Sequence, residues 1–184
     1  MNTDNPEKHT VFADSRQIEN VVVDLAASIK RDYQEKSPLV IGVLKGSFIF
    51  LADLVRKLDI EVEIDFIGLS SYGRGQISCG TVSLYCEPRI EVAGKDVILV
   101  EDIVDSGLST NFAINYLKQR GAESVKLCAL LDKQARRTVD INIDYVGLIA
   151  PEGFLVGYGL DCDESFRNLR NIIILSEEQW QRRT

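Results

Sequence analysis

The sequence has almost no histidine: His9, in a polar N-terminal segment, is its only one. This scarcity excludes histidine-based catalytic triads and typical zinc sites. Cysteine is also sparse, and the four residues, none of which form a C-x-x-C pair, are Cys79, Cys86, Cys128 and Cys162. We therefore expect reduced, structural thiols, which are typical of a cytoplasmic protein.

Signals for export and membrane insertion are missing as well. Residues 1–10 are polar and lack the apolar segment of a signal peptide. No apolar run approaches the length of a membrane span, so we expect a soluble cytoplasmic protein without a membrane partner. The motifs G-x-x-x-x-G-K-[ST] and G-x-S-x-G are absent, and no G-x-G-x-x-G follows a strand. These absences argue against kinase-like, serine-hydrolase and dinucleotide-dependent activities.

Positive charge is in short supply. The chain has 21 Lys and Arg against 28 Asp and Glu, a formal net charge of -7. This balance argues against DNA or RNA as a partner, because a nucleic-acid backbone requires a basic face. A small anion can still bind through local amides, a few cations and Mg²⁺. The 184 residues, 45% of them hydrophobic, suit one compact domain.

The spacing of apolar residues predicts helices that alternate with strands. Asp14 and Gln17 form a capping box for a helix whose apolar stripe runs from Ile18 to Tyr33. Two further helices are expected at residues 48–58 and 109–120. Strands are expected at residues 39–44, 60–66, 97–100, 125–131, 145–149 and 172–175. This alternation predicts an α/β fold with a mostly parallel central sheet flanked by helices.

Polar residues follow three of these strands: Lys45-Gly46, Glu101-Asp102 and Asp132-Lys133. In open α/β sheets, ligands bind at the carboxyl ends of the strands. The three pairs therefore predict one shared site. Residues 70–80 contain three glycines and little core material, which predicts a long mobile loop.

The most informative segment runs from Val97 to Thr110. An apolar strand leads into two adjacent carboxylates, a third carboxylate and a small, hydroxyl-rich turn that opens a helix. Such a turn presents amides and hydroxyls to a phosphate, aided by the helix dipole. Carboxylates beside a phosphate require a cation, sugar hydroxyls or a base function, so the segment indicates a Mg²⁺-bound phosphorylated sugar. The alternative is a solvated strand end in which Ser106 or Ser109 caps the helix.

This segment is similar to the phosphoribosyl-pyrophosphate (PRPP) motif of type I phosphoribosyltransferases: apolar strand, Glu-Asp, two aliphatics, Asp, Ser or Thr, Gly. Residues 37–175 as a whole resemble the hypoxanthine-guanine phosphoribosyltransferases. The match extends in order to Leu44-Lys45-Gly46-Ser47, Ser71-Tyr72, Asp132-Lys133 with Arg136-Arg137, residues 156–161, and Phe166-Arg167-Asn168-Leu169.

The resemblance implies the type I phosphoribosyltransferase fold as a single domain over residues 1–184. Its core covers about residues 37–150, and the N-terminal segment with about residues 151–184 forms a small hood subdomain. The implied assembly is a homodimer or homotetramer.

The implied reaction transfers the 5-phosphoribosyl group from Mg²⁺-PRPP to hypoxanthine or guanine, giving IMP or GMP and pyrophosphate. Two alternatives stay open: a sibling enzyme that accepts another base such as xanthine, and a non-catalytic regulator that senses PRPP or a nucleotide. The acidic net charge and the presence of Asp105, Lys133 and Arg167 argue against the regulator.

Roles in binding the sugar phosphate also follow from the resemblance. Asp105 is the implied general base near the purine N7, and the alternative is that it caps the following helix. Glu101 and Asp102 face the ribose hydroxyls and Mg²⁺, while amides of Ser106, Gly107, Leu108 and Ser109 hold the 5′-phosphate.

The remaining roles concern pyrophosphate and purine. Lys45, Gly46 and Arg167 are implied to bind pyrophosphate, and the peptide bond between Leu44 and Lys45 is implied to be cis. The implied purine pocket consists of Lys133, which donates to a 6-oxo group, Phe154, which stacks on the base, Leu155, and Asp161, which also binds a second Mg²⁺. Ser71 and Tyr72 are implied to close over the site and exclude water. From residue type alone, Lys45 and Lys133 are equally well explained as solvated lysines, and Phe154 as a core residue.

Overall fold

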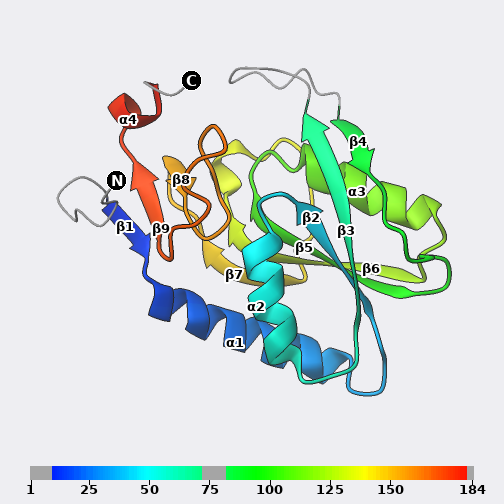
Figure 1. The fold of residues 1–184 in the computed structure, drawn as a ribbon. Helices are drawn as coiled ribbons and strands as arrows, with labels where there is room; N and C mark the ends of the chain where they lie inside the picture. The colour runs from blue at the N-terminus through cyan, green and yellow to red at the C-terminus, as the bar shows by residue number, and fades with distance from the viewer. Residues whose placement is uncertain (1–9, 72–81, 182–184) are drawn as a thin grey trace.

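The computed structural model describes residues 10–71 and 82–181. They form a six-stranded sheet with the order β4-β3-β2-β5-β6-β7 and a three-stranded sheet with the order β1-β9-β8 (Figure 1). The strands are β1 (Thr10–Ala13), β2 (Leu39–Leu44), β3 (Glu63–Ser71), β4 (Val82–Cys86), β5 (Asp96–Val104), β6 (Ser124–Asp132), β7 (Tyr145–Ile149), β8 (Phe154–Val156) and β9 (Ile172–Leu175).

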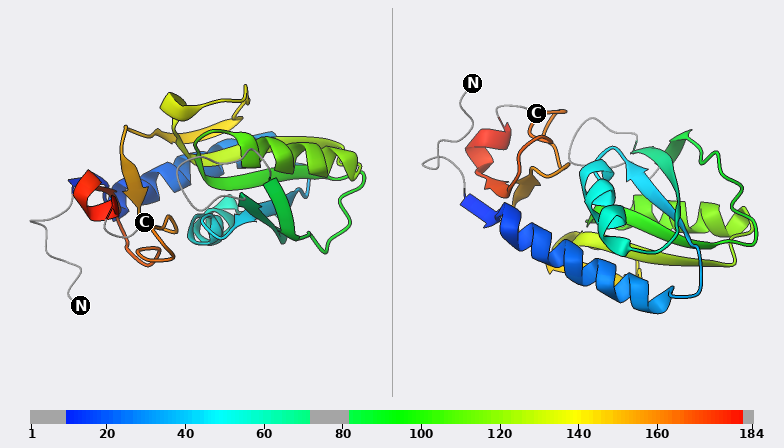
Figure 2. Two further views of the ribbon diagram at one scale, coloured as in Figure 1. Left: turned by 90° about the horizontal axis from the view of Figure 1, so that it is seen from above. Right: turned by 60° about the horizontal axis from the view of Figure 1, so that its bottom comes forward.

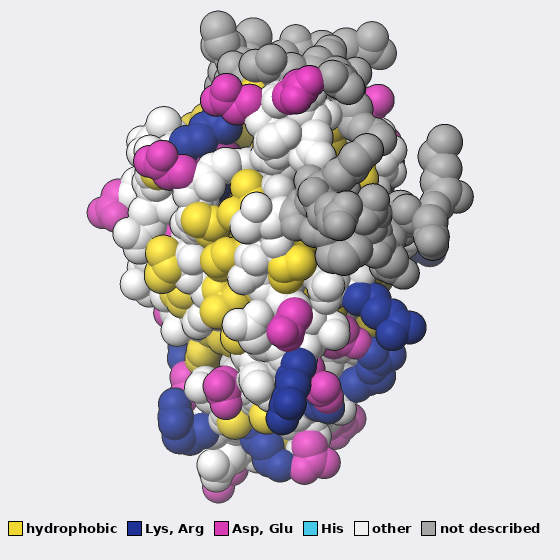
Figure 3. Space-filling model, turned by 90° about the vertical axis from the view of Figure 1, so that its left-hand side faces the viewer, with side chains coloured by type: hydrophobic (Ala, Val, Ile, Leu, Met, Phe, Trp, Pro, Cys, Tyr) yellow, Lys and Arg dark blue, Asp and Glu magenta, His cyan; other side chains and the backbone are white. Residues whose placement is uncertain are grey.

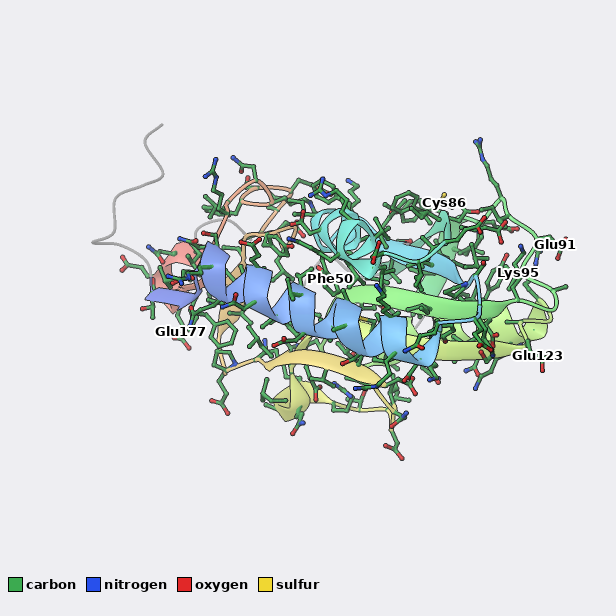
Figure 4. The ribbon with its side chains drawn as sticks, turned by 90° about the horizontal axis from the view of Figure 1, so that it is seen from below. Phe50, Cys86, Glu91, Lys95, Glu123 and Glu177 are labelled. Atoms are coloured by element: carbon green, nitrogen blue, oxygen red, sulfur yellow. The ribbon has the colours of Figure 1, made fainter. Side chains whose placement is uncertain are left out.

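Helices cover both faces of the large sheet (Figure 2). The helices are α1 (Ser15–Asp32), α2 (Phe48–Leu58), α3 (Leu108–Gln119) and α4 (Glu177–Gln181), with a single 3₁₀ turn at Gln134–Arg136. One apolar core lies between the sheet and α1 with α2, and a second lies between the sheet and α3. Phe50, on the side of α2 that faces α1 in Figure 4, is fully buried in the first of these cores.

The large sheet is parallel except at β4, which pairs antiparallel with β3. Alternate residues of β5 enter opposite cores: Ile98 and Val100 face α1 and α2, whereas Val97 and Leu99 face α3. This is the pattern of a central strand buried on both sides. The predicted α/β fold with a mostly parallel sheet is therefore confirmed.

The predicted capping box at the start of α1 is present. The Asp14 side chain accepts from the backbone N–H groups of Arg16 and Gln17, and the Gln17 side chain accepts from the Asp14 N–H at 2.9 Å. The three predicted helices appear within a few residues of their expected ends. Among the described helices, none combines the length and the apolarity that crossing a bilayer requires.

Two predicted strands are displaced. The strand expected at residues 60–66 runs from Glu63 to Ser71, because β4 pairs with its far end, matching Ser70 to Ser83 and Ser71 to Val82. The expected loop at residues 70–80 is therefore wrong for Ser70 and Ser71, and its remainder lies outside the described residues. The strand expected at residues 97–100 continues to Val104 because pairing with β6 persists to Asp132.

The small sheet joins the two ends of the described chain. Strands β1, β8 and β9 were not all expected: only β9 had a strand pattern. Asn171, just before β9, accepts from the Ser15 N–H at 2.9 Å and so ties this sheet to the start of α1. A separate apolar cluster covers the sheet, with Val156, Cys162, Ile173 and Leu175 at its centre.

Candidate active site

Strand β5 carries two carboxylates toward opposite faces of the sheet. Glu101 is 5% exposed and accepts from the Thr110 hydroxyl, on α3, at 3.2 Å. The Asp102 carboxylate instead lies so close to Gly46 that any side chain at residue 46 would collide with it. The expectation that this pair follows the strand needs correction, because both residues belong to β5 itself.

Burial leaves both carboxylates poorly compensated. It raises the pKa of Glu101 well above its ordinary value, with the Asp102 charge adding to the effect and the Thr110 bond opposing it. Burial also raises the pKa of Asp102 to about 6, against backbone hydrogen bonds and the Arg167 charge, which lower it. Such perturbed carboxylates are typical of functional sites.

The turn after β5 lies on a cavity of about 210 Å³, whose walls include Glu101, Asp105, Ser106, Gly107 and Ser109. Helix α3 begins at Leu108, so its free N–H groups face this end of the sheet. Gly107 has φ of 85° and packs against Ile141 and Arg137, so a side chain there would be strained as well as crowded. Three of the four residues predicted to hold the phosphate, Ser106, Gly107 and Ser109, thus line one cavity at the start of α3.

Asp105 does not cap α3. The N-cap is Gly107, which makes no side-chain capping bond, and Ser106 Oγ accepts only a long bond, 3.4 Å, from the Leu108 N–H. The Asp105 Oδ2 atom lies 3.5 Å from Arg136. Its Oδ1 atom is buried and lacks a hydrogen-bond partner among the described residues. The capping alternative is wrong, and one carboxylate oxygen remains available for a ligand.

The turn after β2 lies beside the same strand end. The peptide bond between Leu44 and Lys45 is cis, as the resemblance implied. The Lys45 ammonium is 2.9 Å from the Glu164 carboxylate, and its side chain is 58% exposed. Gly159 has φ of 104° and lies so close to the Gly46 carbonyl that a side chain at residue 159 would collide with it.

Arg167 is the centre of a charged cluster next to this turn. Its guanidinium donates to the Gly159 carbonyl at 2.8 Å and lies 3.0 Å from both Asp161 and Glu164. The side chain is only 18% exposed, and its Nε atom is buried without a partner among the described residues. Sequence reasoning found Asp161 and Arg167 but missed Glu164, which here holds both Arg167 and Lys45.

Two of the four residues predicted to bind the purine, Lys133 and Phe154, line a second cavity of about 400 Å³, together with Gly153. Leu155 and Asp161 are not among its walls, and Asp161 pairs instead with Arg167. Lys133 is 8% exposed and donates to the Gly153 carbonyl at 2.8 Å, which uses one of its three N–H donors. Leu155 is 6% exposed and pairs through β8 with Ile174 of β9.

Arg137 bonds to residues beside both cavities, and no role for it was predicted from the sequence. Its guanidinium donates to the carbonyls of Asp105 at 3.0 Å and Val104 at 2.9 Å, and it pairs with the buried Asp132 carboxylate. Thr138 adds a backbone bond of 2.9 Å to the Ser106 carbonyl. The segment after β6 therefore holds the backbone of the turn after β5. An arginine in a matching motif was the only signal for this contact.

Two predicted site residues fall at the limit of the structure. Ser71 is the last residue of β3, and Tyr72 lies outside the described residues. A larger cavity, of about 590 Å³, lies between α1, α2 and residues 168–170. It contains none of the predicted site residues, so its size does not mark the chemistry.

The carboxylates do not form a complete metal cage. Within residues 10–71 and 82–181, no group of three or more acidic, cysteine or histidine side chains is arranged to hold a metal ion. Mg²⁺ usually keeps several waters and takes only one or two carboxylates, with substrate phosphates supplying further oxygens. Buried carboxylates with raised pKa values fit such a cation, because its charge would offset their desolvation.

Comparison with known proteins identifies the family of this chain. A family model for the phosphoribosyl transferase domain matches residues 10–163. The chain belongs to the phosphoribosyltransferase family. The hypoxanthine-guanine phosphoribosyltransferase of Bacillus subtilis is 41% identical over 90% of this chain and 92% of that protein. That of Aquifex aeolicus is 41% identical over 93% and 97%. The chain also matches a bifunctional protein TilS/HprT of Listeria monocytogenes, at 42% identity, but spans only 26% of its length.

Solved phosphoribosyltransferase structures share the fold. A crystal structure of a hypoxanthine-guanine phosphoribosyltransferase from Bacillus anthracis has a TM-score of 0.86 at 43% identity, covering 90% of this chain and 98% of that one. A hypoxanthine phosphoribosyltransferase from Staphylococcus aureus has a TM-score of 0.90 at 37% identity, covering 97% of each chain. The family and the type I fold expected from the sequence are both confirmed.

Proposed function

We propose that this protein transfers the 5-phosphoribosyl group of PRPP to hypoxanthine or guanine, giving IMP or GMP and pyrophosphate. One observation carries the proposal: Asp105, whose Oδ1 atom is buried and unpartnered among the described residues, lines the cavity at the start of α3. Its other oxygen lies 3.5 Å from Arg136, which lines the cavity that contains the buried Lys133. The names of the relatives point to the same substrates.

The donor binds at the carboxyl end of β5. Amides of Ser106 to Ser109, at the N-terminus of α3, hold the 5′-phosphate. On the other side of the strand, Lys45, the Gly46 backbone and Arg167 bind the pyrophosphate group. Arg167 suits this role because it is fixed by the Gly159 carbonyl and by two carboxylates before any ligand arrives. Fixed charges placed where charge develops stabilise the departing pyrophosphate.

The base is activated by Asp105. As the bond from the sugar C1′ to pyrophosphate breaks and the bond to the purine nitrogen forms, the purine loses a ring proton. The Asp105 Oδ1 atom accepts this proton. The Arg137 contact that fixes the Asp105 backbone supports this role, because a general base must stay within hydrogen-bond reach of the proton that it accepts.

The purine is selected by Lys133, Phe154 and Leu155. Lys133 donates to an oxygen at ring position 6. An amino group at that position offers no acceptor to the Lys133 N–H groups that Gly153 does not use. Leaving a buried polar group unpaired is the strongest way to reject a similar substrate. Phe154 stacks on the ring.

Mg²⁺ is the proposed cofactor: Glu101 and Asp102 would hold one ion, and Asp161 would hold a second. When bound, the cations would offset the negative charge of the diphosphate. We further assign the small sheet of β1, β8 and β9 to the hood, and Ser71 with Tyr72 to a segment that closes over the site.

We propose a homodimer or homotetramer in the cytoplasm. Hydrophobic side chains gather in a band on one side of the molecule, framed by charged residues (Figure 3). A contiguous apolar area of this kind suits an interface between subunits. Cys86 and Cys128 are free thiols, as in a reducing compartment.

The proposal is tested by mixing the protein with Mg²⁺, PRPP and one base at a time: hypoxanthine, guanine, xanthine or adenine. We expect mononucleotide and pyrophosphate in equal amounts from hypoxanthine and guanine. Absence of a mononucleotide with every base would contradict the proposal, and xanthine as the best substrate would favour the sibling enzyme.

A further inference from the structure

One wall of the proposed purine pocket was not predicted by any sequence motif. The cavity that contains Lys133 and Phe154 is also lined by Glu177 and Trp180. Both residues belong to α4, the short helix after β9, and Glu177 lies at the end of the molecule where α4 meets the small sheet (Figure 4). The C-terminal helix therefore reaches the place where the base is proposed to bind.

Trp180 contacts the aromatic residue proposed to stack on the base. The ring centroids of Phe154 and Trp180 are 5.9 Å apart, and the ring planes differ by 13°. Nearly parallel, offset rings at this separation attract each other beyond the area that they bury. Both side chains also pack on the apolar cluster that covers the small sheet, so Trp180 is seated on the same support as Phe154.

Phe154 benefits from such support because the strand that carries it is short. Strand β8 has only three residues, Phe154 to Val156, and the Phe154 side chain is partly exposed. The preceding Gly153 supplies the carbonyl that holds Lys133, so the position of β8 sets both contacts to the base. A binding group works only when its own orientation is locked by surrounding residues.

We propose that Trp180 is a positioning residue of the purine pocket: its indole holds the Phe154 ring in the orientation that stacks on the base. The proposal rests on the function proposed above. Trp180 acts through Phe154, and it belongs to the acceptor half of the site alone. A change at Trp180 should therefore affect the purine and leave the sugar phosphate unaffected.

A kinetic comparison tests this assignment. We expect Trp180→Ala to raise the KM for guanine and hypoxanthine about three- to tenfold, the range that one aromatic pair provides, with the KM for PRPP changed less than about twofold. Trp180→Phe restores most of the loss because a second ring can still lie parallel to Phe154. Glu61→Gln, at an exposed position before β3 and outside the proposed site, serves as the control and should behave as the wild type.

Two kinetic outcomes would overturn the assignment. An unchanged purine KM in Trp180→Ala would show that the indole does not serve the pocket. Equal increases in the KM for purine and for PRPP, with no recovery in Trp180→Phe, would show that the residue merely stabilises the small sheet.

Fluorescence gives a second, direct readout because Trp180 is the only tryptophan in the chain. Saturating GMP should change the emission of Trp180, whereas ribose 5-phosphate, which lacks the base, should not. Equal emission changes with both ligands, or none with GMP under conditions where calorimetry shows binding, would contradict the proposal. These failures are separable from failure of the proposed function, in which the wild type itself would form no nucleotide.

Discussion

The Oδ1 atom of Asp105 is a buried acceptor without a hydrogen-bond partner among the described residues. Such a group costs free energy in the folded protein, so its retention calls for a ligand. The Asp105 backbone carbonyl, by contrast, accepts a hydrogen bond from Arg137. A carboxylate with a fixed backbone and a free oxygen is suited to accepting a proton from a bound substrate.

Replacing Asp105 by Asn tests that role. The amide keeps the size of the side chain but cannot take up a proton, so we expect kcat to fall about 10²- to 10⁴-fold. The Kd of Mg²⁺-PRPP, measured by calorimetry, should change by less than about threefold. Comparable losses in kcat and in PRPP affinity would identify Asp105 as a binding residue instead.

Asp102 gives a second test, through pH. Its pKa is about 6 in the folded protein, against an ordinary value of 3.8, so between these values the folded state binds a proton that the unfolded state does not. Without Mg²⁺, the free energy of unfolding should therefore fall as pH rises from about 4 to about 6 and level off above that. Asp102→Asn removes this group, so we expect the variant to be more stable than the wild type by about 1–2 kcal/mol at pH 7.5.

The measurement is chemical denaturation of both proteins from about pH 3.5 to about pH 7.5 in the presence of a chelator. The difference between them should shrink as pH falls below about 6 and vanish only below about 4, where Asp102 is protonated in both the folded and the unfolded protein. A difference that does not vary with pH would show that Asp102 titrates normally. Because the Asp102 charge also raises the pKa of Glu101, removing it relieves Glu101 as well and adds to the difference.

At the scale of the elements, the segment that follows β6 holds the backbone of the turn after β5 in place. Arg137 bonds to the backbone of Val104 and Asp105, and Thr138 bonds to Ser106. The base and the phosphate cradle are thus fixed to the strand that carries Lys133. Misplacement of catalytic groups by even about 1 Å can cost about 10²-fold in rate.

We therefore expect Arg137→Met to lower kcat/KM for PRPP at least about tenfold, because the apolar stem remains while the bonds to the turn are lost. Steady-state kinetics at saturating guanine measures this effect. Arg120→Met removes another arginine, whose exposed partner Glu87 is 3.7 Å away at the far end of α3, and should leave the rate unchanged. Equal rates in the two variants would show that the turn needs no such support.

Elements with one continuous apolar pattern could be predicted from the sequence. Element ends that depend on pairing with another strand could not. Strand β2 and helix α2 have the predicted ends because their apolar patterns start and stop there. The extension of β3 to Ser71 depends on β4, whose residues carry only a weak alternation, and the extension of β5 depends on β6. Helix α4, with five residues, had no pattern to find.

The same contrast holds for the site. Residues in a contiguous motif, such as Glu101 to Ser109, could be predicted because the motif is local. Arg137, Glu164 and Trp180 could not be assigned from sequence, because their roles arise from contacts with segments far away in the chain. Only folding brings their partners within reach.

Across the whole molecule, the site lies at one end. Figure 4 shows Glu177, next to the purine pocket, at the end opposite to Lys95 and Glu123. In the proposed site, the sugar phosphate is bound mainly by residues at the end of the large sheet, and the base by Lys133 together with the small sheet and α4. Donor and acceptor would then be recognised by largely separate parts of one fold, so this architecture could accept a different base without changing its donor.

The most direct test of this account is the ratio of initial rates with hypoxanthine and with adenine, at equal concentrations and saturating Mg²⁺-PRPP. Lys133 offers a donor to the group at ring position 6, so we expect IMP to form at least about 10²-fold faster than AMP. Equal rates with the two bases, or a faster reaction with adenine, would contradict the assignment of the acceptor pocket.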